Sequence, residues 1–212
     1  MITIKAFEFN DFHVNTFVLY DETSDCVIID PGCITDGEHK ELTSFISQNK
    51  LHPVKLFNTH AHIDHIVGNK FVATTYNIGL EVHKGAMSFL HSAKGYAVAF
   101  GFDNVEFVDP VGFVEEGDVI KFGNSELKVL YTPGHADGSI CFYSEKENFI
   151  IVGDVLFRDS IGRTDLPSGD FDMLMKSIKT KLFELPANTV VYPGHGGTTT
   201  IEYEKENNPF VM

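Results

Sequence analysis

The stretch that decides the fold of this chain reads Asn58-Thr59-His60-Ala61-His62-Ile63-Asp64-His65. It places three imidazoles and one carboxylate within six positions. In an extended segment, side chains two residues apart point to the same side, so His60 and His62 can reach one metal ion. Asp64 and His65 come where the chain can turn, and they offer ligands in a second direction. We therefore predict a metal site here, with ordinary polar residues of a surface loop as the alternative.

Three later segments place a candidate ligand directly after a predicted strand, at a turn rich in glycine or proline. Glycine and proline bend the chain sharply and leave room for a side chain to project over the edge of a sheet. Taken alone, a histidine there would be an ordinary turn residue, and an aspartate would be a turn or helix cap. The segments are Thr132-Pro133-Gly134-His135, Gly153-Asp154 and Tyr192-Pro193-Gly194-His195-Gly196-Gly197.

Together with the first cluster, these segments supply seven candidate metal ligands. The candidates are His60, His62, Asp64, His65, His135, Asp154 and His195. One closed structural zinc needs only four ligands. Two ions with an aspartate between them and open positions for water would use the whole set.

The composition restricts the class of protein and its partners. With 212 residues, the chain fits one domain over residues 1–212 with a substantial core. Sixteen Lys and Arg against thirty Asp and Glu give a formal charge of -14, which argues against nucleic acid or an anionic membrane as a partner. Cys26, Cys33 and Cys141 form no CxxC pair, so we expect neither disulfides nor a thiolate zinc site. Without a signal-peptide core or an apolar run of membrane-span length, a soluble cytoplasmic protein is expected.

The first half of the chain predicts short strands followed by helices. Alternating apolar residues and turn signals predict strands at 2–9, 16–20 and 26–29, the last closed by Asp30-Pro31-Gly32. Helical spacing predicts helices over 38–49, 65–76 and 85–94, with strands at 54–57 and 80–83. The metal motif therefore follows a strand. Gly95 to Asn104, rich in glycine and aromatic residues, is predicted to be a mobile loop or a substrate lid.

The second half repeats this plan. Strands are predicted at 119–122, 126–131, 139–143 and 149–152, with a hairpin around Gly123-Asn124, and an amphipathic helix over 171–183. Strand runs precede a helix in both halves. This rhythm predicts an α/β protein in which two sheets pack face to face with helices outside.

The motifs together resemble the metallo-β-lactamase superfamily over nearly the whole chain. The residues that carry the resemblance are the motif from Thr59 to His65, the Asp30-Pro31-Gly32 turn, and His135, Asp154 and His195 in this order. Gly153-Asp154-Val155-Leu156-Phe157 and Gly162-Arg163-Thr164-Asp165 are similar to the glyoxalase II branch, the hydroxyacylglutathione hydrolases and their small bacterial relatives. The closing Pro193-Gly194-His195-Gly196 and Asn208-Pro209-Phe210 resemble the short members of that branch. The fold implied is the four-layer αββα sandwich.

The resemblance also implies a role for each ligand. One metal would be held by His60, His62 and His135, the other by Asp64, His65 and His195, with Asp154 as the bridge. Asp30 would support the site by hydrogen bonding to the ligands. Imidazole and carboxylate accept several metals, and we expect two divalent ions, with zinc ahead of iron or manganese.

The activity implied is hydrolysis of a small-molecule thioester, such as S-lactoylglutathione or another S-2-hydroxyacyl thiol. Two ions sharing a water would supply a metal-bridging hydroxide, while one ion polarises the substrate carbonyl. Asp64 would act as a catalytic residue that orients this water and accepts its proton. The longer glyoxalase II enzymes carry a further helical domain that supplies much of the glutathione site, whereas about 17 residues follow His195 here.

Other activities stay open at this point. Persulfide dioxygenases of the same branch share the Gly162-Arg163-Thr164-Asp165 stretch and use one iron held by two His and one Asp, so metal content separates them from the hydrolases. A lactonase or a β-lactamase would need pocket features that the sequence does not identify. A binding module with a structural metal would be signalled by lost ligands, and none of the expected ligands is missing from the sequence.

A second group of residues has two interpretations each. Arg163 is a candidate contact for an anionic group of the substrate, although an Arg that pins Asp165 in its own loop is preferred. Tyr143 is a candidate substrate contact or a core residue, and the same choice holds for Phe100 and Phe102. The remaining histidines lie outside any ligand pattern and are predicted to be surface or packing residues: His13, His39, His52, His83 and His91.

Overall fold

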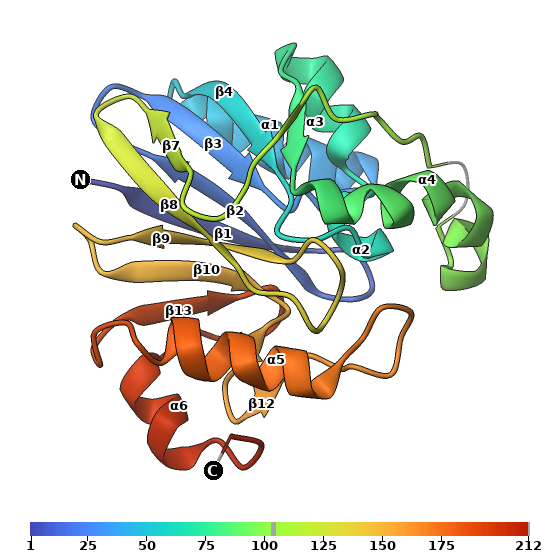
Figure 1. Cartoon of the computed structure of the whole chain (residues 1–212). Coiled ribbons are helices and arrows are strands. Elements are labelled where there is room, and N and C mark those ends of the chain that lie inside the picture. The colour runs from blue at the N-terminus through green and yellow to red at the C-terminus, as the bar shows by residue number, and fades with distance from the viewer. Residues whose placement is uncertain (103–104, 212) are drawn as a thin grey trace.

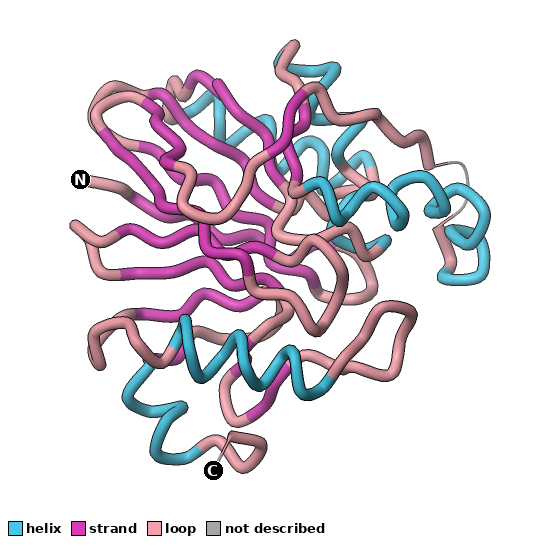
Figure 2. The backbone as a smooth tube through the Cα atoms, viewed as in Figure 1, coloured by secondary structure: helices cyan, strands magenta, loops and turns pink. Residues whose placement is uncertain are grey.

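Four layers make up the computed structural model, which describes residues 1–102 and 105–211 (Figure 1). Two sheets of six strands lie in the middle, and helices cover the outer side of each (Figure 2). The predicted α/β class and the four-layer αββα arrangement are therefore confirmed.

The first sheet has the strand order β1-β2-β3-β4-β5-β6. Neighbours among β1 to β3 are antiparallel, and the pairs from β3 to β6 are parallel because helices cross between them. The strands are β1 Thr3–Phe9, β2 Val14–Tyr20, β3 Asp25–Ile29, β4 His52–Phe57, β5 Leu80–Val82 and β6 Gly112–Phe113.

The second sheet has the order β14-β13-β10-β9-β8-β7. Only β10 and β13 pair in parallel, and the other neighbours form antiparallel hairpins or returns. A separate hairpin joins β11 Leu156–Phe157 to β12 Ser160–Ile161. The sheet strands are β7 Val119–Phe122, β8 Ser125–Tyr131, β9 Ile140–Ser144, β10 Phe149–Gly153, β13 Val190–Pro193 and β14 Thr199–Thr200.

Three α-helices, α1, α5 and α6, begin at side chains that cap them. Thr35 and Glu38 form a reciprocal capping box at the start of α1, and Asp170 and Thr200 cap α5 and α6. The helical segments are α1 Asp36–Gln48, α2 Ile63–Ile66, α3 Asn69–Tyr76, η1 Lys84–Ala86, α4 Met87–Tyr96, η2 Ala97–Phe100, α5 Phe171–Ser177, η3 Ile178–Leu182 and α6 Ile201–Asn207.

Successive side chains of a strand point to opposite faces of its sheet, and this alternation produces three apolar layers. In β2, Val18 points to the core under the first set of helices, whereas Phe17 and Leu19 point to the core between the sheets. Phe57 and Phe142 meet between the sheets with ring centroids 5.2 Å apart. A third core lies between the second sheet and α5 and α6. Both sheets are thus buried on two faces, which leaves the strand ends as the place for a polar site.

Two predicted segments differ from the structure. The helix predicted over 65–76 is two helices, α2 and α3, because the backbone N–H of Gly68 donates to the carbonyl of Pro31 at 2.8 Å and so leaves the helical hydrogen-bond pattern. The loop or lid predicted over Gly95 to Asn104 is helical as far as Phe100, where α4 continues into η2. Residues 103–104 of that segment lie outside the described residues.

At the C-terminus, β14 and α6 had no counterpart in the prediction, and β13 was expected only as a strand without bounds before His195. β13 has four residues, β14 has two and α6 has seven, so none is long enough to show a clear period. No helix within the described part of the chain is long and apolar enough to cross a membrane.

Candidate metal centre

Strand ends bring the predicted ligands together. β4 runs into the loop that carries His60 and His62, and α2 follows at once with Asp64 and His65. From the second sheet, the loop after β8, the end of β10 and the end of β13 contribute the remaining three ligands: His135, Asp154 and His195. The structure thus gathers all seven candidates at one edge of the sandwich.

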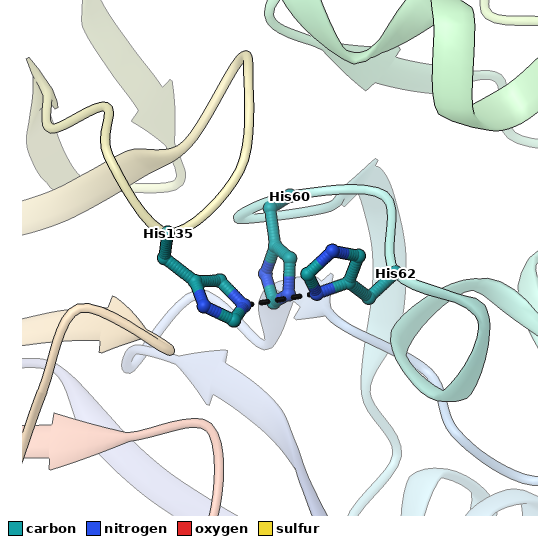
Figure 3. A group of neighbouring side chains, drawn as sticks. All are labelled: His60, His62 and His135. Carbon is teal, nitrogen blue, oxygen red and sulfur yellow. Dashed lines mark hydrogen bonds between the residues drawn. The ribbon is translucent and has the colours of Figure 1, made fainter. Parts of the chain in front are cut away.

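Three of them form an all-imidazole group, which we call the histidine triad: His60, His62 and His135 (Figure 3). One ligand atom from each ring lies within 4.8 Å of the other two. His62 Nδ1 and His135 Nε2 are 2.9 Å apart. Figure 3 shows the three rings converging from the His60 loop and from the loop after β8. Three converging nitrogens with no carboxylate are a suitable ligand set for zinc or a similar ion.

A second group, the carboxylate triad, consists of Asp64, His65 and His195. Asp64 Oδ2 lies 3.2 Å from His195 Nε2 and 3.6 Å from His65 Nε2. The two imidazole nitrogens face each other at 3.3 Å. This triad uses a different set of atoms from the histidine triad, so the first sequence cluster is divided between two sites.

Asp154 lies between the two triads. Its Oδ1 is 3.4 Å from His65 Nε2, and its Oδ2 is 3.7 Å from His135 Nε2. Its Oδ2 is also 3.5 Å from His195 Nε2. One carboxylate therefore contacts ligands of both triads, which is the arrangement that a bridging ligand requires.

Oxygen acceptors behind the rings set which nitrogen faces the centre. His135 Nδ1 donates to the carbonyl oxygen of Arg163 at 2.8 Å, and His195 Nδ1 donates to that of Phe12 at 2.9 Å. Carbonyl oxygens only accept, so the proton is on Nδ1 and the Nε2 lone pair points inward. Such outer hydrogen bonds orient metal-binding histidines.

Asp30 performs the same function for His65. Its Oδ2 accepts from His65 Nδ1 at 3.0 Å and from the Thr59 hydroxyl at 2.6 Å, while its Oδ1 accepts from the Thr59 backbone N–H at 2.7 Å. Asp30 is fully buried. Asp30, His60 and His65 also lie close enough to form a third group of possible ligands, but these hydrogen bonds already occupy both oxygens of Asp30. Asp30 is thus placed behind the ligands, as the resemblance implied.

Two glycines make room for the ligands. Gly134 has a φ of 127°, a left-handed value, and a Cβ there would collide with the backbone of Leu174 in α5. A Cβ on Gly194 would run into the Asp154 carboxylate and lie 2.8 Å from the His65 ring. The glycine preceding each of these two histidines, His135 and His195, is therefore required by close packing.

The two triads differ in protonation. Burial first, and then the neighbouring His135, lower the pKa of His62 to about 4, and burial likewise lowers the pKa of His60 and His135. Burial alone would also lower the pKa of His195, but hydrogen bonds to Asp154 and Asp64 raise it to about 10. The pKa of His65 is raised in the same way, because the nearby carboxylates outweigh its burial. The histidine triad is neutral and ready to bind a cation, whereas the carboxylate triad attracts either protons or a cation.

Unpartnered polar atoms test whether metal ions fit. His60 Nε2 and Asp154 Oδ1, which face the centre, are buried without a hydrogen-bond partner among the described residues. Buried polar atoms are normally paired. In addition, the inward nitrogens of His65 and His195 lie 3.3 Å apart, where their lone pairs repel unless a proton or a metal ion lies between them. The residues present fit a dinuclear metal site.

A cavity of about 440 Å³ opens above this centre. Of the two candidate substrate contacts, Arg163 lines this cavity and Tyr143 does not. The Arg163 guanidinium donates two hydrogen bonds of 2.7 Å to the carboxylate of Asp165, the interpretation preferred above. Tyr143 lies elsewhere: it is buried in β9 and borders a different groove beside Lys128 and Lys146. The structure therefore does not bring Tyr143 to the predicted site.

Sequence reasoning did not find the residues that hold the His195 loop. Asn15 donates through Nδ2 to the carbonyls of Pro193 and Gly196, each at 2.9 Å, and its backbone N–H donates to Gly194 O at 2.6 Å. Asn15 is 180 positions before His195, and no local pattern connects them. Phe12, which supplies the carbonyl for His195 and a ring of the cavity wall, was missed for the same reason.

This fold, with two triads joined by a carboxylate, is typical of a metallo-hydrolase whose ligands fit two ions. A family model for the metallo-beta-lactamase superfamily matches residues 9–195, and the chain belongs to that superfamily.

Three similar proteins extend the comparison. Hydroxyacylglutathione hydrolase GloC of Haemophilus influenzae is 33% identical over 212 residues, covering 99% of this chain and 98% of that protein. The crystal structure of BLEG-1, a B3 metallo-beta-lactamase, matches with a TM-score of 0.90 and 34% identity over 99% of this chain and 100% of that one. TTHA1623, solved in a di-iron-bound form, matches with a TM-score of 0.87 and 32% identity over 97% and 99% of the two chains. The chain is thus similar to short superfamily members along their whole length.

Proposed function

We propose that this metallo-hydrolase is a thioester hydrolase that cleaves S-2-hydroxyacyl thiols, S-lactoylglutathione among them. The observation that carries the proposal is the position of Asp154, in contact with His65 of one triad and His135 of the other. A shared carboxylate holds two ions close enough to act on one water and one carbonyl. The similarity to the hydroxyacylglutathione hydrolase GloC supports an acyl thiol as the substrate.

The ligand chemistry supports two divalent ions, for which zinc is our first candidate. The histidine triad would hold one ion, the carboxylate triad the other, and Asp154 would contact both. When bound, such ions supply a water acidified toward neutral pH and a Lewis acid for the carbonyl oxygen. Iron is the first alternative, because TTHA1623 has been solved in a di-iron-bound form.

The chain's own groups would position this chemistry. Burial alone would raise the pKa of Asp64, but His65 and His195 hold it below its usual value, so the carboxylate is ionised at neutral pH. An ionised Asp64 can orient the attacking water and accept its proton. Asp30 keeps the Nε2 of His65 turned toward Asp64 and Asp154. Each of these roles depends on an oxygen that the structure places within the site.

The expected partner is a small molecule. The cavity of about 440 Å³ lies in the range of small-molecule sites. A formal charge of -14 supports our expectation that neither nucleic acid nor an anionic membrane is a partner.

The proposal is tested by metal analysis of the purified protein together with a thioester hydrolysis assay. We expect about two divalent ions per chain and release of free thiol that a chelator abolishes. One iron per chain, with oxygen uptake on a persulfide and no thiol release, would instead identify a dioxygenase. Hydrolysis of a lactone or a β-lactam in place of the thioester would reject the substrate class and keep the metal chemistry.

A further inference from the structure

The cavity above the metal centre has a polar floor and apolar walls. Its floor consists of ligands from both triads together with Asp154. The walls carry four aromatic and three aliphatic side chains, namely Phe12, Phe89, Tyr96, Phe100, Ile63, Leu166 and Pro167. A substrate whose scissile bond reaches the floor must therefore place its remaining atoms against these walls.

Segments far apart in the sequence build the aromatic side of the wall. Phe12, in the turn between β1 and β2, stacks on Phe102 with ring centroids 5.4 Å apart and lies 6.5 Å from the Phe100 ring. Deeper in the cavity, the Phe89 ring of α4 meets the ligand His62 edge to face at 5.2 Å. The apolar surface thus extends from the mouth of the cavity to the metal ligands.

Positive charge is scarce along this path. Within the described part of the chain, Arg163 is the one lining residue with a basic side chain other than histidine. Its guanidinium already makes two hydrogen bonds to Asp165, so the pair is neutral as a unit. A carboxylate on the thiol part of the substrate would lose water against the aromatic walls and meet no unpaired cation among the described wall residues, and such a transfer is unfavourable.

We infer that this cavity selects thioesters whose thiol part is apolar and uncharged in preference to glutathione thioesters. The inference rests on the proposed thioester hydrolysis and names its substrate class. Glutathione carries two carboxylates and an ammonium group, whereas a neutral aromatic or branched thiol matches the walls in both shape and polarity. The apolar walls bind the thiol part, and the floor receives the carbonyl.

The test compares three thioesters with one acyl group. S-lactoyl derivatives of benzyl mercaptan, N-acetylcysteamine and glutathione differ only in the thiol. We expect the benzyl compound to have the highest kcat/KM, about tenfold or more above the glutathione compound. Equal values, or a preference for glutathione, would overturn the inference and leave the hydrolase proposal intact. No release of any of the three thiols would reject the hydrolase proposal itself.

Binding gives a readout that does not depend on turnover. Thioether analogues, in which a methylene replaces the carbonyl, are titrated into the metal-loaded protein by calorimetry. The benzyl thioether should bind about tenfold or more tightly than the glutathione thioether. The opposite order would reject the inference even if no thioester is hydrolysed.

A charge placed in the wall should reverse the preference. Phe100 is 45% exposed, so Phe100→Lys leaves the core intact. It should lower kcat/KM for the benzyl thioester and raise it for the glutathione thioester, moving their ratio by about tenfold. Phe113→Lys is the matched control, because Phe113 is 49% exposed and does not line the cavity. A ratio that moves equally in both variants, or in neither, contradicts the assignment of the wall.

Discussion

The two halves of the metal centre use the same imidazole chemistry in opposite electrostatic settings. The histidine triad contains no carboxylate, and burial lowers the pKa of each of its rings. The carboxylate triad contains Asp64, and its two imidazoles have a raised pKa because carboxylates surround them. Burial keeps the imidazoles of the histidine triad neutral and so able to bind a cation, whereas the carboxylate triad attracts a cation through its negative charge.

The largest effect that separates the halves is expected from Asp64→Ala. Loss of this carboxylate removes a ligand of one half and the proposed proton acceptor, so turnover should fall by about 10² to 10⁴-fold. The histidine triad stays complete, and metal analysis should find about one ion per chain in place of two. The control is Asp172→Ala, which removes an exposed carboxylate in α5. Unchanged thioesterase activity in Asp64→Ala would count against the mechanism.

A smaller effect is expected from Asp30→Asn, which acts on one half through His65. The change removes the negative charge behind His65 Nδ1, and partners of this kind typically contribute about 10- to 100-fold in metal affinity or activity. Competition with a chelator, followed separately for each ion, measures the metal affinity of each triad. Affinity should fall in the carboxylate triad and change little in the histidine triad. Equal losses in both would show that Asp30 stabilises the whole site and does not position His65 alone.

Protons should compete with metal in one half only. Since the pKa of His195 is raised to about 10, this ring is protonated at neutral pH without metal, and ion binding must release the proton. The pKa of His62 is lowered to about 4, so the histidine triad releases none. Calorimetry in buffers of different ionisation enthalpy should detect proton release for the carboxylate triad, which should also lose its ion first on acidification. Equal proton release from both halves would contradict the comparison.

The raised pKa of His195 also predicts how pH affects the stability of the metal-free protein. The pKa of His195 is higher in the folded state than its ordinary value of 6.5. Its stabilising contribution is therefore fully present below pH 6.5 and is lost as the pH rises toward about 10. Thermal melting with a chelator present should show the midpoint falling over this interval. A midpoint that rises over the interval would mean that His195 is neutral in the folded chain.

The smallest effect is expected outside the centre, at Tyr143. The structure places this residue in a groove with Lys128 and Lys146 and not in the cavity above the ligands. Tyr143→Phe should therefore leave kcat/KM for a thioester within about twofold of the original value, because a hydroxyl outside the cavity makes no contact that is lost in the transition state. A tenfold loss of kcat/KM in this variant would show that Tyr143 contacts the substrate after all.

Local patterns predicted most of the fold. The strands around β2, β8 and β10 and the helices α1 and α5 are visible in the sequence because apolar residues recur at the period of each element. The division between α2 and α3 was not visible, since it follows from the hydrogen bond between the backbone N–H of Gly68 and the carbonyl of Pro31. The helical course of Ala97–Phe100 was hidden by composition, because glycine and aromatic residues indicated a loop.

In the candidate site, too, features set by contacts between distant segments were not predicted from the sequence. The seven ligands were recognisable because metal binding demands particular side chains at turns after strands. Their outer partners were recognisable only in part. Asp30 belongs to a motif, whereas Asn15 and the carbonyl of Phe12 act on the His195 loop from the other end of the chain. A backbone carbonyl carries no sequence signal, since every residue has one.

The sequence by itself determined the ligand types, their order and the four-layer plan, because these depend on local chemistry and on the periods of strands and helices. The resemblance already implied the two sets of ligands with Asp154 between them. Only the tertiary structure decided that the two halves differ electrostatically and that Tyr143 lies outside the centre. The physical reason is that burial and distance set the pKa of each imidazole and the charge of each cavity wall. Those quantities arise only when segments far apart in the chain pack together.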